Sequence, residues 1–92
     1  LDQAVSEADR MRDGIAIMTR QLADLQDRIP GLAGSITAAE AQYRRRNLDG
    51  ATLAGLRSDY DGDVAAAVRL EAALKKADAA LRMLLGLPLT DD

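Results

Sequence analysis

The sequence predicts an all-α protein, a long antiparallel coiled-coil helical hairpin. Apolar residues make up 48% of the 92 residues but aromatic residues only 2%, and the chain is rich in Ala, Leu and charged residues. Such a composition is typical of long helices and coiled coils. Apolar residues also recur at spacings of three and four in both halves of the chain, and turn-forming residues gather between the halves. We therefore expect a single helical hairpin over residues 1–92.

The first predicted helix covers about residues 2–46. After Leu1, its apolar residues keep the 3-4 spacing without a break: Ala4, Ala8, Met11, Ile15, Met18, Leu22, Leu25, Ile29, Leu32, Ile36, Ala39 and Tyr43. Side chains at an average spacing of 3.5 lie on one face of a coiled-coil helix, which we call the seam. This face is predicted to pack against a second helix.

Pro30 and Gly31 lie within this first helix. A proline removes a backbone donor and clashes with the carbonyl group four residues earlier, and a glycine weakens a helix further. Because the seam keeps its phase from Ile29 to Leu32, we expect one helix that is kinked near Pro30. The alternative is a turn at Pro30-Gly31, which would produce a three-helix bundle.

The bend of the hairpin is predicted at residues 47–50. Asn47 and Asp49 can cap helix ends through their short side chains, and Gly50 accepts a positive φ. Two helices joined by so short a connection lie antiparallel.

The second predicted helix covers about residues 51–85. Its seam consists of Leu53, Leu56, Tyr60, Asp63, Ala67, Leu70, Leu74, Ala77, Leu81 and Leu84. Asp63 is the charged exception in this seam, with Val64 beside it as an apolar substitute. Gly86, followed by Leu87 and Pro88, predicts a left-handed cap and a stop to the helix.

A stripe of small residues runs beside both seams. Its members are Ala16, Ala23, Ala33, Ala38, Ala41, Ala65, Ala66, Ala72, Ala73, Ala79 and Ala80. Helices with an additional small-residue face suit a larger bundle or ring, in which each helix packs on both sides. Ala is also the best helix former, so both explanations of the stripe stay open.

Composition and spacing argue against several classes of function. The chain has no His and no Cys, which removes the usual zinc ligands, the commonest general base and the thiol nucleophile. Asp59, Asp61 and Asp63 do not follow the calcium-loop spacing, because Gly62 and Leu70 stand at its fourth and twelfth positions. We predict no enzymatic activity, no cofactor and no metal site.

Nucleic acid and membrane spans are also disfavoured. The net charge of −3 is unlike that of a nucleic-acid-binding domain. No apolar run in the sequence approaches the roughly 18 residues that span a bilayer. Three consecutive arginines, Arg44 to Arg46, precede the bend. Charge runs at a bend are mostly solvated, but arginines also suit the recognition of carboxylates on another protein, and the residues alone leave both explanations open.

The ordered motifs of residues 29–89 resemble a repeat of the TolC-like outer-membrane efflux factors. In that family a helix containing a proline is followed by an aromatic residue, a turn, a second helix and a closing LLGLP motif. Here the corresponding places are filled by Pro30, Tyr43, residues 47–50 and the segment that ends at Gly86-Leu87-Pro88. The preceding residues have a compatible helical pattern, and the chain is expected to be one hairpin of a longer protein.

The resemblance implies a function and a location. In this family three protomers pool their hairpins into a periplasmic α-helical tunnel, and the hairpin tips dock to a periplasmic adaptor protein that works with an inner-membrane pump. The resemblance therefore implies a homotrimer and the periplasmic portion of an outer-membrane protein. The docking tip would comprise Arg44, Arg45, Arg46, Asn47, Leu48, Asp49 and Gly50. Asp59, Asp61 and Asp63 would face the tunnel lumen or pair with neighbouring arginines.

Two other functions compete with this one. The alternative is a generic coiled-coil interaction or dimerisation module, which requires no resemblance. A third is the hairpin of a periplasmic adaptor, but such hairpins carry an Arg, a Leu and a Ser at heptad-like intervals near the tip. Counting from Arg44, Arg45 or Arg46 does not reproduce that set.

Overall fold

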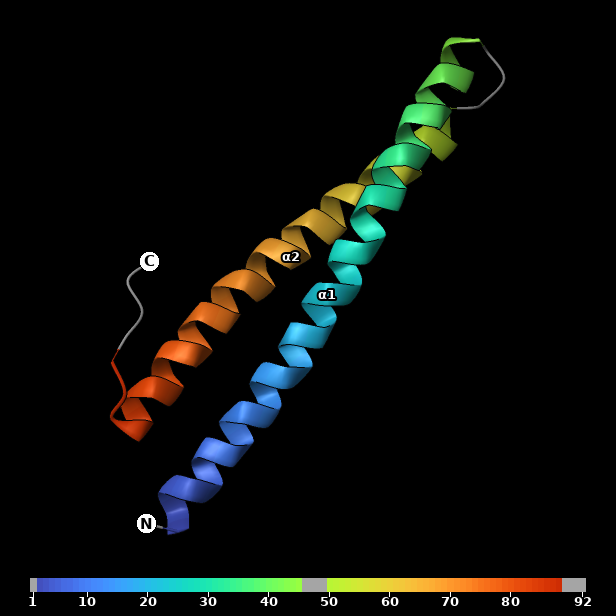
Figure 1. Cartoon of the computed structure of the whole chain (residues 1–92). Coiled ribbons are helices and arrows are strands. Elements are labelled where there is room, and N and C mark those ends of the chain that lie inside the picture. Colours follow the sequence, from blue (N-terminus) through green and yellow to red (C-terminus); the bar gives the residue numbers. More distant parts are fainter. Residues whose placement is uncertain (1, 46–49, 89–92) are drawn as a thin grey trace. The chain divides into compact units, whose positions relative to one another are not determined.

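The computed structural model describes residues 2–45 and 50–88, which form two long helices. Helix α1 is Asp2–Arg44 and helix α2 is Gly50–Leu85 (Figure 1). Neither described range contains a β-strand. The prediction of an all-α helical hairpin is therefore confirmed. Helix α1 ends two residues before the predicted 46, and α2 begins at Gly50, which was assigned to the bend.

The two helices form two packed units. Among the described residues, the bend unit comprises 23–45 and 50–68, and the terminal unit combines 2–22 with 69–88. Within each unit, a segment of α1 lies antiparallel to a segment of α2 (Figure 1).

The predicted seams are the least exposed faces of both units. In the bend unit the buried or half-buried seam residues are Leu25, Ile29, Leu32, Ile36, Ala39, Leu53, Leu56, Tyr60, Asp63 and Ala67. In the terminal unit they are Ala8, Met11, Ile15, Met18, Leu22, Leu70, Leu74, Ala77, Leu81 and Leu84. Residues at 3.5-residue spacing thus pack between the helices, as expected of a coiled coil.

Two of the predicted seam residues at the ends of α1 are exposed, although the ring of Tyr43 still lies near α2 at Gly50. Ala4 and Tyr43 are both exposed. Tyr43 lies in the last turn of α1 beside the bend, where α2 begins at Gly50, and Ala4 lies in the first turn of α1. The 3-4 pattern continues through both positions, but a helix end offers less of a partner helix to cover a side chain.

The core between the helices is thin. Among the described residues, the buried side chains are those of Ala8, Ala39, Leu53 and Ala67. Leu53, at 5% exposure, is the large side chain among them. The other apolar residues of the seams keep part of their surface in contact with solvent. Each unit therefore buries far less apolar surface than a globular core of the same length would.

Helix α1 continues through Pro30 without interruption. The alternative of a turn at Pro30-Gly31 and a three-helix bundle is therefore wrong, and the expected kink near Pro30 is not confirmed. Pro30 is exposed, whereas Ile29 and Leu32 on either side of it belong to the packed seam. Water can therefore reach the backbone carbonyl group that loses its partner, while the seam contacts on both sides hold the helix together.

The end of α2 confirms the predicted glycine cap. Gly86 has a φ of +70°. The amide of Leu87 donates to the carbonyl of Arg82 at 2.8 Å, and the amide of Gly86 donates to the carbonyl of Met83 at 3.3 Å. This pair of hydrogen bonds is the Schellman motif, which requires a left-handed residue that glycine adopts without a steric penalty.

The small-residue stripes remain largely uncovered. Seven of their alanines are exposed: Ala16, Ala23, Ala38, Ala65, Ala72, Ala73 and Ala80. The hairpin therefore uses one face of each helix for its own packing and leaves the alanine faces open.

Candidate interaction site

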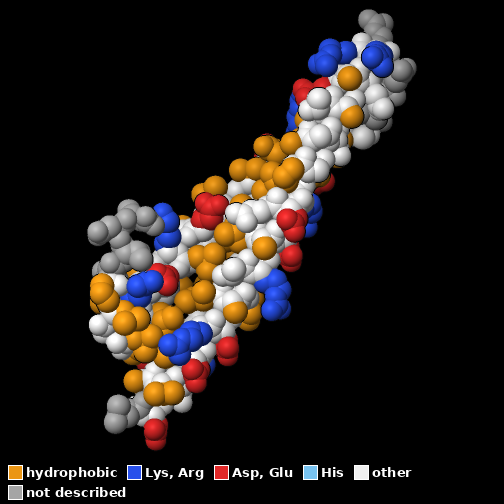
Figure 2. Space-filling model, in the orientation of Figure 1, with side chains coloured by type: hydrophobic (Ala, Val, Ile, Leu, Met, Phe, Trp, Pro, Cys, Tyr) orange, Lys and Arg blue, Asp and Glu red, His pale blue; other side chains and the backbone are white. Residues whose placement is uncertain are grey.

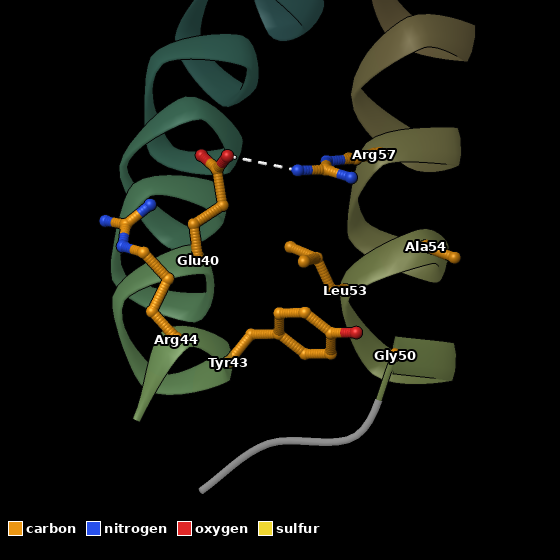
Figure 3. Close-up of a pocket in the computed structure, with 7 residues that line it drawn as sticks. All are labelled: Glu40, Tyr43, Arg44, Gly50, Leu53, Ala54 and Arg57. Carbon is orange, nitrogen blue, oxygen red and sulfur yellow. Dashed lines mark hydrogen bonds and ion pairs between the residues drawn. The ribbon is translucent and has the colours of Figure 1, made fainter. Parts of the chain in front are cut away.

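The bend end of the hairpin forms a shallow groove between the last turns of α1 and the first turns of α2. The groove has a volume of about 230 Å³. It is lined by Glu40, Tyr43, Arg44, Gly50, Leu53, Ala54 and Arg57 (Figure 3). All of these residues belong to the bend unit.

Leu53 and Tyr43 form the apolar part of this groove. The side chain of Leu53 points from α2 toward α1, and the ring of Tyr43 lies beneath it across the helix pair (Figure 3). Tyr43 keeps 50% of its surface exposed. A Cβ atom placed on Gly50 would lie 3.7 Å from the ring, an ordinary contact distance, so the first turn of α2 lies close to Tyr43. A half-open aromatic ring beside a buried leucine offers a partner an apolar contact.

The charged groups around the groove differ in how they are paired. Arg57 donates from Nη2 to the Oε2 atom of Glu40 at 3.0 Å, which joins α2 to α1 (Figure 3). Arg44 and Arg45 are exposed, and neither forms an ion pair with another described residue. The described part of the bend end therefore presents two unpaired cations beside an exposed aromatic ring.

The structure covers part of the predicted docking tip. Arg44 is the last residue of α1, Arg45 follows in a turn, and Gly50 is the first residue of α2. Arg46, Asn47, Leu48 and Asp49 were assigned to the same tip and lie outside the described residues. Sequence reasoning did not identify Glu40, Leu53 or Arg57 as neighbours of the tip. Arg57 and Glu40 lie at similar distances from the bend, which is the signal that would have suggested their pairing.

A second charged cluster lies further along the bend unit, around Asp63. Arg28 of α1 donates from Nε to Oδ2 of Asp63 at 2.7 Å and from Nη2 to Oδ1 at 2.9 Å. Asp59 and Leu32 line the same open groove beside this ion pair. Asp61 is exposed and has no ion pair with a described residue. Of the three aspartates singled out in the sequence, the structure therefore pairs one with an arginine of its own chain.

The Arg28–Asp63 pair combines a sheltered carboxylate with an exposed guanidinium group. The side chain of Asp63 is 18% exposed, whereas that of Arg28 is 61% exposed. The hydrogen bonds from Arg28 lower the pKa of Asp63 from its ordinary value, although partial burial acts in the opposite direction. The same hydrogen bonds raise the pKa of Arg28. The ionised form of Asp63 is therefore favoured in the folded chain.

Large apolar side chains are also exposed away from the bend. In the terminal unit these are Val5, Ile17, Met83, Leu85 and Leu87. In the bend unit the side chain of Val68 is exposed as well. Figure 2 shows hydrophobic side chains on the visible surface of both helices. Single exposed apolar residues are normal for a protein surface, but here they accompany the open alanine faces.

The described ranges contain neither a metal-ligand cluster nor a membrane-spanning helix. Within residues 2–45 and 50–88, no three acidic side chains converge in a way that would hold a metal ion. Neither α1 nor α2, as described, has the combination of length and apolar character that crossing a bilayer requires.

The fold and the site together define a helical-hairpin protein with an arginine-bearing bend. No protein-family model matches the chain, and neither a curated protein nor a solved structure matches it.

Proposed function

We propose that this hairpin is a segment of the periplasmic α-helical tunnel of an outer-membrane efflux or secretion channel, and that its bend docks to a periplasmic adaptor protein. The assembly would be a homotrimer that works with an inner-membrane pump. The proposal combines the resemblance of residues 29–89 to TolC-like repeats with the surface that the two helices leave open.

The observation that carries the proposal is the small share of apolar surface that the hairpin buries by itself. Its seams are mostly half-buried, and the alanine stripes beside them are largely open. A wall of a helical tunnel needs this distribution, because each helix must pack against a neighbour on either side. Exposed apolar faces of this kind mark surfaces that pack against another protein.

The residues at the bend support the second part of the proposal, which is docking to an adaptor. Arg44 and Arg45 are exposed, and the groove next to Arg44 combines Tyr43 with Leu53. Arginine and tyrosine are enriched at the energetically important positions of protein interfaces. An adaptor with carboxylates around an apolar side chain would complement this end. Asp59 and Asp61 would face the lumen or a neighbouring protomer.

Cross-linking in the cells that make the protein tests the proposal. Asp49→Cys places a single thiol at the bend of a chain without Cys, and Ala73→Cys is the matched control on an exposed part of α2. With a short cross-linker, the bend variant should capture a periplasmic adaptor, identified by its mass, and the control should not. Capture of cytosolic proteins, or equal capture by both variants, would contradict the proposal.

A generic coiled-coil interaction module is the second candidate. It is favoured by the two ion pairs that join α1 to α2, Arg28–Asp63 and Glu40–Arg57, because they satisfy charges within a single hairpin. Such a module needs no tunnel and no adaptor. The cross-linking experiment separates the two candidates, since the module would give no adaptor at the bend.

A further inference from the structure

We propose that the Arg28–Asp63 ion pair fixes the register of α1 against α2 in the bend unit. This role is independent of the tunnel and would hold for any hairpin function. A hairpin whose seams contain mainly Ala, Leu, Ile and Met has little in its apolar packing to distinguish one alignment from another. A slip by one heptad moves one helix by about 10.5 Å and again places apolar residues opposite apolar residues.

Asp63 makes the possible alignments of α1 and α2 differ in free energy, because it occupies a seam position. Its neighbours along the seam are Tyr60 and Ala67, and its side chain is sheltered to 18% exposure. A carboxylate at such a position is tolerated when both oxygens are satisfied. Arg28 satisfies both of them in a two-pronged contact from the opposite helix. This geometry gives directional recognition that an apolar contact lacks.

The sequence offers Asp63 no other cation within reach. Arg28 is the only Lys or Arg between Arg20 and Arg44. A one-heptad slip would bring either Gln21 or Ser35 opposite Asp63, and neither carries a charge.

The same slip also removes the partner of Arg28. The residues one heptad before and after Asp63 are Leu56 and Leu70, so a slipped alignment would place a leucine where the carboxylate stands. The observed register is thus the one that pairs both charges.

The Glu40–Arg57 pair agrees with this register but constrains it less. It is joined through one guanidinium nitrogen, and its side chains are more exposed than that of Asp63. Buried or sheltered polar groups in a coiled coil contribute specificity more than stability. We therefore assign the decisive role to Asp63 and a supporting role to Glu40.

The register can be measured with two nitroxide spin labels on the whole chain. Ala23→Cys and Ser58→Cys lie on exposed positions of the two helices in the bend unit, and the chain has no other thiol. These positions are offset along the helix pair by about 15 Å, so a one-heptad slip changes the label separation by roughly 5–8 Å. Dilution with unlabelled chain removes distances between molecules.

The proposal predicts a single distance for the labelled parent chain and a second distance, in at least one tenth of the molecules, for Arg28→Leu/Asp63→Leu. The single variant Arg28→Gln should also show the second distance, because the new glutamine and the native Gln21 would then be equivalent partners for Asp63. The Arg28→Gln measurement decides the question if circular dichroism shows that the double variant has lost its helix. An unchanged single distance in the helical variants would overturn the proposal.

Two controls distinguish a change of register caused by losing Arg28 and Asp63 from an effect that the loss of any ion pair would have. Asp78→Leu/Arg82→Leu removes a pair that is joined by one hydrogen bond of 2.9 Å and lies within α2, so it does not link the two helices. This variant and Glu40→Gln should keep the single distance of the parent chain. A second distance in either control would show that the alignment does not depend specifically on Arg28 and Asp63.

Discussion

Truncation of Leu53 tests how much the burial of this side chain between the helices stabilises the bend unit. Leu53 is 5% exposed and lies between the helices above the ring of Tyr43 (Figure 3). Leu53→Ala removes three carbon atoms, and at about 0.8 kcal/mol for each buried carbon the loss is about 2.4 kcal/mol. The groove beside Leu53 is open, so solvent and neighbouring side chains can fill the space and the cavity contribution stays small.

The assay is thermal unfolding followed by circular dichroism at one fixed protein concentration. For a domain of this size, a loss of about 2.4 kcal/mol lowers the melting temperature by roughly 10–19 °C. Met83→Ala is the matched control, because Met83 is 72% exposed and its truncation should change stability by less than about 0.5 kcal/mol. Equal melting temperatures for the two variants would refute the idea that burial at Leu53 stabilises the bend unit.

Other predictions concern Asp63 and two glycines. The pKa of Asp63 is lowered in the folded chain, so its pairing with Arg28 stabilises the fold above the ordinary carboxylate pKa and this contribution is lost as the pH falls below about 4. The melting temperature of the parent chain should therefore exceed that of Asp63→Asn at pH 7, and the difference should shrink below pH 4; a constant difference would contradict the pairing. Gly86→Ala should lower stability by about 1 kcal/mol, because an alanine at a φ of +70° is strained. Gly62→Ala, inside α2 with open space around it, should raise stability by about 0.5–1 kcal/mol. A melting temperature of Gly86→Ala that equals or exceeds that of the parent chain would argue against the cap.

The spacing of apolar residues predicted which face of each helix is packed, because this depends on the sequence of that helix alone. The seam positions from Ala8 to Ala39 and from Leu53 to Leu84 are less exposed than their surroundings, as the 3-4 spacing requires. The glycine cap could also be predicted, because a left-handed residue followed by an apolar residue and a proline is a local signal.

Pro30 shows where a local rule was insufficient. The rule that an interior proline disrupts a helix considers the lost hydrogen bond and the steric clash. It does not include the seam contacts of Ile29 and Leu32, which lie on both sides of an exposed proline in a continuous α1. Tertiary packing therefore decided whether the helix ended, and a single-residue signal does not contain that information.

The pairing of the charged residues was the feature that the sequence predicted least well. The spacing identified Asp63 as an exception in its seam, but its pairing with Arg28 depends on how far α1 is shifted along α2. A repeating pattern is compatible with several such shifts. The same dependence explains why Glu40, Leu53 and Arg57 were not linked to the bend before their positions were known.

The central claim is that the open faces of α1 and α2 are packing surfaces for further helices. Sedimentation equilibrium of the chain from micromolar to millimolar concentration tests it most directly. The account predicts a mass that rises above the 9.8 kDa monomer with concentration, together with a melting temperature that rises in parallel, because association stabilises the folded state by mass action. A monomeric mass at every concentration, with a constant melting temperature, would contradict the claim and identify a hairpin that is complete in isolation.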